Sequence, residues 1–273
     1  MENKDYPKYV ETQILKIFEK ENLKSLTNLK DYFPSQDNLI NIYRKRYYKN
    51  FQDNVIDIST KKFILLDDET AEIQNDKIWK LSYDIKNCND DLKLLVAQLY
   101  LFRPYINNPI LEKSNFSGRM EFTYRQTFSD WNYSTFVSCC YEKLYNYWDR
   151  IGDILALYLK INIDERKVGF FTVINKIEKE EKYSNDENLI FLKNFKDNEF
   201  REFNEKRIEI VHYYQFETIY RHKYQKIQAE NNKEEKMNAL WEWKKNMPEY
   251  FKNHLELSLK GYQHCIKFIN EHF

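Results

Sequence analysis

The chain has 273 residues, of which 32% are charged, and its 43 basic and 43 acidic side chains give no net charge. This balance excludes a protein that coats nucleic acid through bulk positive charge, although it is compatible with a local RNA site. Only four glycines and five prolines occur, whereas sandwiches and barrels need frequent turn residues. The composition therefore predicts an all-α fold of long helices joined by few turns.

Cysteine usage and hydropathy bear on the compartment. Cys88, Cys139, Cys140 and Cys265 form neither a CxxC pair nor a Cys/His ligand spacing, so we expect buried free thiols and no metal site. Residues 1–13 lack the apolar stretch of a signal peptide. No segment approaches the roughly 20 apolar residues of a membrane span. We expect a cytoplasmic protein that does not enter a membrane.

The N-terminal part of the chain has the weakest patterns. Residues 6–50 predict two or three amphipathic helices, with a break near Pro34. Residues 55–85 are the least helical stretch and predict a short hairpin. A helix over residues 90–103 ends before Pro104.

A turn at Asn107-Asn108-Pro109 marks a domain boundary. We expect a mostly helical N-terminal region of unknown role over residues 1–112 and an antiparallel helical bundle over residues 113–273. Beyond about residue 130 the pattern sharpens into four helices. Each has one apolar stripe to bury, which is typical of a bundle.

Capping residues mark where these four helices begin. Ser134 or Ser129-Asp130 can cap the first helix, and Asp164 can cap the second. The third helix is expected to run unbroken from about 197 through 225. Pro248 suits the first turn of the last helix.

The third expected helix carries Arg207 and His212. His can move a proton near neutral pH, and Arg can clamp a phosphate in a bidentate manner. The spacing alone is unspecific, because an Arg four to six residues before a His is expected about 0.5 times by chance in such a chain. The alternative is a solvated Arg and a His whose ring is satisfied by a backbone carbonyl.

Two segments of the C-terminal part share their pattern with a known family. Tyr141–Leu159 holds an aromatic residue followed by an Asp-Arg-Ile-Gly step, and Glu205–His212 holds an R-x4-6-H motif. Together they resemble the HEPN superfamily, and within it the Cthe_2314-like branch of free-standing bacterial proteins. The likeness covers roughly residues 115–273.

The resemblance implies a compact bundle that dimerises and a metal-independent endoribonuclease, often the toxin or abortive-infection effector of an antiphage system. On this interpretation His212 is the general acid or base and Arg207 binds the scissile phosphate. The expected products are a 2′,3′-cyclic phosphate and a 5′-OH end, and no cofactor is needed. The expected partners are RNA, a second copy of the chain and an antitoxin or other defence-system protein.

Two features complicate this site. A five-residue offset rotates Arg207 and His212 apart by about 140° on a regular helix. They can face one phosphate only if the helix is distorted, if it ends between them, or if a second subunit supplies one of them. Superfamily nucleases also place a polar residue after the motif Arg, whereas this chain has Ile208, for which Asn204 or Glu209 can substitute.

Other residues are weaker candidates for supporting roles. Asp149 can orient His212 or Arg207, or can form part of an ion-paired helix face with Asp153. Tyr214 fits an extended R-x4-H-x-Y string in which the resemblance implies modification by a nucleotidyltransferase antitoxin.

The densest basic stretch contains Arg44, Lys45 and Arg46, interleaved with tyrosines. It predicts either RNA binding or an amphipathic helix with a cationic outer face. The histidines at 222, 254, 264 and 272 are interpreted as surface or rim residues.

No P-loop, GxGxxG, GxSxG or HExxH motif occurs. The leading hypothesis is therefore an endoribonuclease. The alternatives are a non-catalytic HEPN module that dimerises or binds a partner or nucleotide, and a plain helical scaffold. Ile208 favours the non-catalytic module, and the intact Arg207–His212 pair favours the enzyme.

Overall fold

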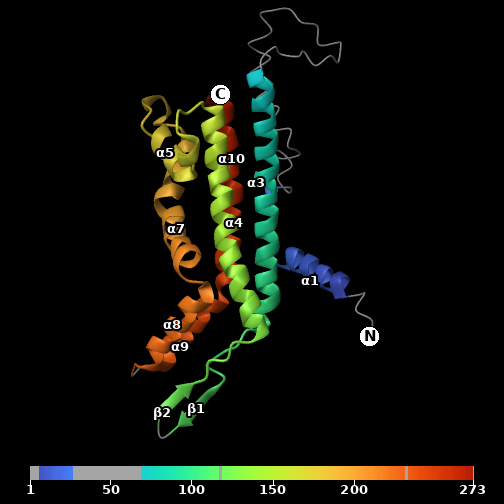
Figure 1. The fold of residues 1–273 in the computed structure, drawn as a ribbon, viewed down its shortest axis with the longest axis vertical. Helices are drawn as coiled ribbons and strands as arrows, with labels where there is room; N and C mark the ends of the chain where they lie inside the picture. The colour runs from blue at the N-terminus through green and yellow to red at the C-terminus, as the bar shows by residue number, and fades with distance from the viewer. Residues whose placement is uncertain (1–5, 27–68, 117–118, 231–232, 273) are drawn as a thin grey trace, which may run out of the picture. The chain divides into compact units, whose positions relative to one another are not determined.

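The computed structural model describes residues 6–26, 69–116, 119–230 and 233–272 (Figure 1). The predicted break near Pro34 and the basic stretch at 44–46 lie outside these residues, as do residues 55–68 of the predicted hairpin region. The elements are, in chain order, α1 Tyr6–Lys20, α3 Glu69–Phe102, β1 Lys113–Phe116, β2 Arg119–Phe122, α4 Phe128–Tyr158, α5 Phe170–Ile177, α6 Glu187–Phe195, α7 Arg201–Ile208, α8 Phe216–Gln228, α9 Lys233–Lys245 and α10 Met247–His272. The all-α prediction is confirmed, and none of the described helices is apolar enough over sufficient length to cross a membrane.

Helix α3 begins well before the helix predicted at 90–103. The prediction that residues up to 85 are poorly helical is wrong for 69–85. Ile78, Ile85 and Leu92 are all buried and recur every seven residues. This narrow apolar stripe, on a segment without Pro or Gly, stabilises the helix through packing despite its many polar residues.

A hairpin follows α3 where no strand was predicted. Strands β1 and β2 are antiparallel, with Lys113 opposite Phe122. Among the strand residues whose burial is described, only Phe122 at the end of β2 enters the core, where it packs with Tyr220 and Tyr224 of α8 and with Met237 of α9. The hairpin is therefore attached through its end to the neighbouring pair α8 and α9 (Figure 1).

The described residues pack into two compact units, and the long helices α3, α4 and α10 contribute to both. The first unit draws on the described residues within 1–24, 91–145 and 201–256. The second draws on the described residues within 25–90, 146–200 and 257–273.

The core of the second unit is built around Trp148 of α4, which is fully buried. Its ring stacks on Phe195, with the ring centroids 3.9 Å apart. A Cβ at Gly261 of α10 would lie 2.2 Å from Trp148 Cη2, and a Cβ at Gly152 would lie 2.6 Å from the backbone nitrogen of Phe170. The Trp-Asp-Arg-Ile-Gly step is thus a place where α4 lies in close contact with α5 and α10.

The caps differ from those predicted. Thr127 caps α4, because its Oγ1 accepts a hydrogen bond from the backbone nitrogen of Asp130 at 3.2 Å, and Asp130 accepts one from the backbone nitrogen of Thr127 at 2.9 Å. Ser134 lies inside the helix instead. Asp164 caps only a short 3₁₀ turn, and Gly169 occupies the cap position of α5.

Candidate active site

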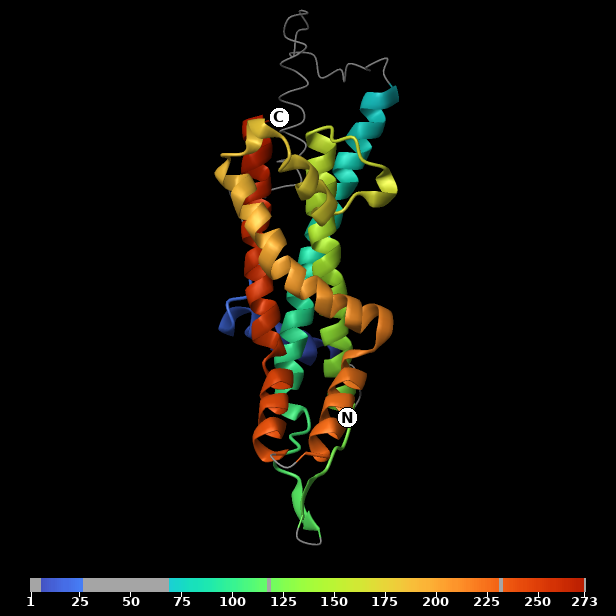
Figure 2. The same ribbon diagram turned by 90° about the vertical axis from the view of Figure 1, so that its left-hand side faces the viewer.

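The segment predicted as one helix over 197–225 is interrupted twice. A π-helical turn spans Lys196–Phe200, α7 follows, and a second π-helical turn spans Glu209–Tyr213. Tyr214 is extended, and its backbone nitrogen donates to the carbonyl of Glu209 at 2.9 Å. The chain then changes direction and enters α8 (Figure 2). The prediction of an unbroken helix is therefore wrong at the motif itself.

The second π-turn brings Arg207 and His212 together. Arg207 Nη1 lies 3.2 Å from His212 Nε2. A regular helix would hold these side chains about 140° apart, but the i→i+5 turn is wider and rotates His212 back toward Arg207. Of the three arrangements that the sequence left open, the distorted helix brings the pair together within one chain.

Arg207 is held by an aromatic ring of α4. Its guanidinium carbon lies 4.1 Å from the centre of the Tyr145 ring, which orients the planar group through a cation–π contact. Its Nε is buried and has no hydrogen-bond partner among the described residues. His212 is exposed, so the pair is open to a ligand from solvent.

The residues around the pair are exposed and largely apolar. Ile208 is 36% exposed, Val211 38%, Tyr213 70% and Tyr214 59%. We call these four residues the motif rim. Exposed apolar residues grouped on one segment are typical of a surface that meets another molecule.

The supporting candidates are placed differently from one another. Asn204 lies on α7, and its Oδ1 is buried without a hydrogen bond among the described residues. Glu209 is exposed, and its backbone closes the π-turn. Asp149 belongs to the second unit, where its Oδ1 accepts from the backbone nitrogen of Phe170 at 3.3 Å. Asp153 pairs with Arg150 at 2.5 Å, as expected for an ion-paired face.

A groove of about 810 Å³ lies beside the motif in the first unit. The π-turn contributes Ile210 and Val211 to its lining. The remaining lining residues come from α4, α8 and the segments preceding them: Gln126, Thr127, Phe128, Trp131, Ser134, Thr135, Ser138, Cys139, Glu142, Gln215, Glu217, Thr218 and Arg221. We call this the motif groove; the sequence did not indicate it.

A buried charge network lies beneath the motif groove. Lys244 of α9 is 1% exposed, and its Nζ lies 2.9 Å from Asp130 Oδ1 and 3.3 Å from Glu217 Oε2. Ser134 Oγ donates to the same Glu217 oxygen at 2.5 Å. The other oxygen, Glu217 Oε1, is buried and unpaired among the described residues. The network fixes the start of α8, directly after the motif.

One histidine of α10 is more buried than predicted. His254 is only 6% exposed, against Phe203 and Tyr250, and burial together with the nearby Lys206 charge lowers its pKa to about 4. The surface or rim interpretation is therefore wrong for His254. His264 and His272 are partly buried, as the rim interpretation allows. His222 is exposed, as expected.

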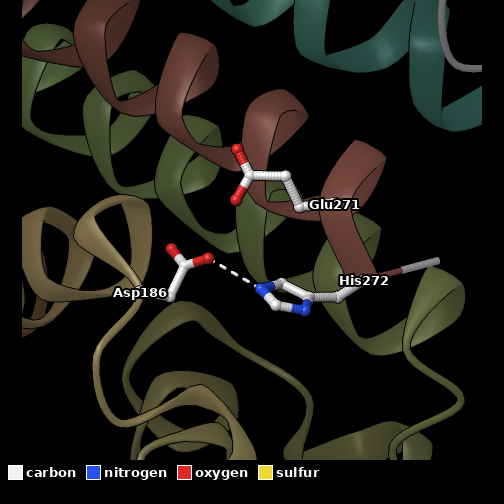
Figure 3. Close-up of side chains that lie close together, drawn as sticks. All are labelled: Asp186, Glu271 and His272. Carbon is white, nitrogen blue, oxygen red and sulfur yellow. Dashed lines mark hydrogen bonds and ion pairs between the residues drawn. The ribbon is translucent and has the colours of Figure 1, made fainter.

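Within the described ranges, one group of side chains is close enough to hold a metal ion: Asp186, Glu271 and His272 in the second unit (Figure 3). Its contacts have a structural explanation. Asp186 Oδ1 caps α6 through the backbone nitrogens of Asn188 and Leu189, and Oδ2 pairs with His272 Nε2 at 2.7 Å. Burial raises the pKa of Asp186, but the hydrogen bonds from His272 and Leu189 outweigh it and hold the pKa below its ordinary value. The cluster ties the end of α10 to α6.

No curated protein and no solved structure matches the chain. A family model, that of the Cthe2314-like HEPN proteins, matches residues 85–270 and so begins ahead of the boundary expected at residue 113. The match includes the Trp-Asp-Arg-Ile-Gly step, the π-turn and the whole of α4 through α9. The chain belongs to the Cthe2314-like HEPN family.

Proposed function

We propose that this protein is a metal-independent endoribonuclease whose active site contains Arg207 and His212. The observation that carries the proposal is the 3.2 Å contact between Arg207 Nη1 and His212 Nε2 across the exposed π-turn. Membership of a HEPN family adds support, because HEPN domains are frequently ribonucleases. Side-chain chemistry of this kind is sufficient for RNA, which supplies its own nucleophile.

Cleavage requires two proton transfers and stabilisation of charge. The 2′-oxygen of the RNA attacks the phosphorus, the bond from phosphorus to the 5′-oxygen breaks, and a 2′,3′-cyclic phosphate and a 5′-OH end result. The neutral ring of His212 takes the proton of the 2′-OH. Arg207 binds the phosphate oxygens as negative charge develops on them.

A second copy of the chain supplies the remaining proton. One imidazole cannot act as base and acid on opposite sides of the phosphorus in a single step, so a protonated His212 from a second protomer donates to the 5′-oxygen. The exposed motif rim, with Tyr213 at 70% and Tyr214 at 59% exposed, offers the apolar surface for such a dimer. The mass of the protein in solution, measured by light scattering, tests this step, and Tyr213→Asp is expected to yield monomers.

The decisive test is cleavage of RNA in EDTA. The wild-type protein is expected to cut and leave cyclic phosphate ends. His212→Ala is expected to lower the rate by at least about 100-fold, because general acid–base catalysis contributes that much. His222→Ala is the matched control, since His222 is an exposed histidine outside the motif. Equal loss in both variants, or cleavage that stops in EDTA, contradicts the proposal.

The biological role proposed for this activity is that of a toxin or abortive-infection effector. Expression in bacteria is then expected to inhibit growth, and His212→Ala is expected to relieve the inhibition. Tyr214, which is 59% exposed, is the proposed target of a nucleotidyltransferase antitoxin. Mass spectrometry of Tyr214 after co-expression checks this, and an unmodified tyrosine contradicts it.

Ile208 favours a second candidate function, a non-catalytic HEPN module. This side chain is 36% exposed at the position where a polar helper is expected, so it adds apolar surface and no hydrogen bond. Such a module dimerises or binds a protein partner or nucleotide through the motif rim. Purified protein that dimerises but neither cuts RNA nor inhibits growth is the outcome that selects this function.

A further inference from the structure

We propose that the motif groove binds a nucleobase of the RNA strand whose phosphate lies at Arg207 and His212, and that it selects bases with an exocyclic amino group. This inference rests on the proposed function and names a substrate preference for the same site. The π-turn carries both features, because it contains His212 and also contributes Ile210 and Val211 to the groove.

Two exposed aromatic rings at the start of α4 provide a stacking surface. Phe128 is 71% exposed and Trp131 is 61% exposed, and both line the motif groove. Their ring centroids lie 6.3 Å apart in an edge-to-face arrangement. A base that stacks on either ring would cover apolar surface that water now contacts.

The acceptor that discriminates between bases is Glu217. This residue lines the groove and is only 8% exposed. Its Oε2 accepts hydrogen bonds from Ser134 and Lys244, whereas Oε1 has no donor among the described residues. A buried acceptor without a donor is unfavourable, so a ligand that supplies an N–H group gains from this atom.

Adenine, cytosine and guanine each carry an exocyclic amino group that can donate to a carboxylate. Uracil has none. It presents carbonyl oxygens on both sides of its single N–H, and a carbonyl facing Glu217 is repelled. The groove is therefore expected to discriminate against uracil.

Arg221, which lines the motif groove, offers a positive charge to a ligand. Arg221 is exposed, and its Nη2 donates to Gln126 Oε1 at 2.8 Å, so both side chains are held at the opening. Its guanidinium carbon also lies 5.1 Å from the Tyr124 ring. A cation at the rim suits a neighbouring phosphate of the same strand.

The polar lining of the motif groove argues against a second copy of the chain as the molecule that binds there. The lining contains Ser134, Ser138, Thr218 and Glu217, and Glu217 Oε1 has no hydrogen-bond partner among the described residues. An apolar side chain inserted there would leave these groups without hydrogen bonds. A nucleobase can stack on Phe128 or Trp131 and can also form hydrogen bonds with the polar lining residues through its edge.

Binding without cleavage gives the cleanest test. In the His212→Ala protein with EDTA, fluorescence anisotropy measures the affinity for short labelled oligo(A), oligo(C) and oligo(U). We expect oligo(A) and oligo(C) to bind roughly tenfold more tightly than oligo(U), and Trp131→Ala to weaken their binding by roughly tenfold. Tyr105→Ala is the control, because Tyr105 is 68% exposed and does not line the groove.

Glu217→Gln provides a second, sharper variant. Ser134 and Lys244 donate to the position of Oε2, so the amide oxygen must lie there. The amide nitrogen then replaces Oε1 and presents a donor to the groove. The preference is expected to reverse toward oligo(U), while the thermal unfolding curve reports whether the variant is folded. A folded variant with the original preference overturns the assignment to Glu217.

Other outcomes also overturn the proposal. Equal binding of the three oligonucleotides removes base selection, and unchanged binding in Trp131→Ala removes the stacking surface. A change from dimer to monomer in Trp131→Ala would assign the groove to contact between copies. If the wild-type protein binds the oligonucleotides selectively but does not cleave RNA, the base-binding groove is supported and the proposed nuclease activity is contradicted. If it cleaves RNA but shows no base preference, the nuclease activity is supported and the base-binding groove is contradicted.

Discussion

The two segments that carry the family likeness are packed in opposite ways. The Trp-Asp-Arg-Ile-Gly step of the second unit is closed, because Trp148 is fully buried and Gly261 of α10 lies directly against its ring. The Arg207–His212 segment of the first unit is open, with an exposed histidine and an exposed rim. The first segment therefore contributes to the core, whereas the second leaves its side chains open to solvent and carries the proposed active site.

Helix α4 contains one buried and one exposed tryptophan, and substituting each of them gives the clearest test of this difference in packing. Trp148→Ala is expected to cost about 3–5 kcal/mol of unfolding free energy, because it removes a fully buried ring. Trp131→Ala is expected to stay within about 0.5 kcal/mol, since that ring is 61% exposed. Urea denaturation of both variants measures the difference. Similar losses in the two would contradict the buried and exposed assignments.

The next largest effect is a pH dependence of stability that comes from His254 of α10. His254 has a pKa of about 4 in the folded protein because burial disfavours its charged form. As the pH falls, the unfolded chain takes up the proton first, so the free energy of unfolding has its full value above about pH 6.5. It then declines by about 1.4 kcal/mol per pH unit until the pH approaches 4.

Urea denaturation between pH 7 and pH 5 checks this decline. His254→Leu is expected to flatten it, because Leu fills a similar volume and cannot be protonated. His222→Leu is the control, since His222 is exposed. An unaltered slope in His254→Leu would place the titrating group elsewhere.

A smaller effect is expected at the capping box of α4. Thr127→Ala removes the acceptor for the backbone nitrogen of Asp130 and should cost about 1 kcal/mol. Ser129→Ala is the control, because Ser129 was a predicted cap that the structure places inside the helix. Thermal unfolding distinguishes the two, and a larger loss in Ser129→Ala would restore the original prediction.

The bundle was predictable because its helices show apolar stripes, and local exceptions explain what was missed. The hairpin has no alternating pattern, since Phe122 is its one core residue among those whose burial is described. The start of α3 lacks a strong stripe and is stabilised by packing of widely spaced residues such as Ile78 and Ile85. Sequence patterns report local periodicity, and these elements depend on distant partners.

The motif residues of the candidate site could be predicted from the sequence, but the turn that joins them and the groove beside them could not. The 140° offset showed that a regular helix would not suffice, but a π-turn has no residue signature, so its presence had to come from the structure. The motif groove joins residues far apart in sequence, as in the bond between Ser134 and Glu217 across 83 positions. No single stretch of the chain contains that information.

The smallest expected change in stability belongs to the residue with the largest expected effect on activity. His212→Ala should alter the unfolding free energy by less than about 0.5 kcal/mol, because the ring is exposed and its side-chain contact is with the partly exposed Arg207. The same variant is expected to lose cleavage. Urea denaturation and RNA cleavage measured on one preparation test both halves. A marked loss of stability would mean that His212 holds the π-turn together, and the open segment would then contribute to the fold as the closed one does.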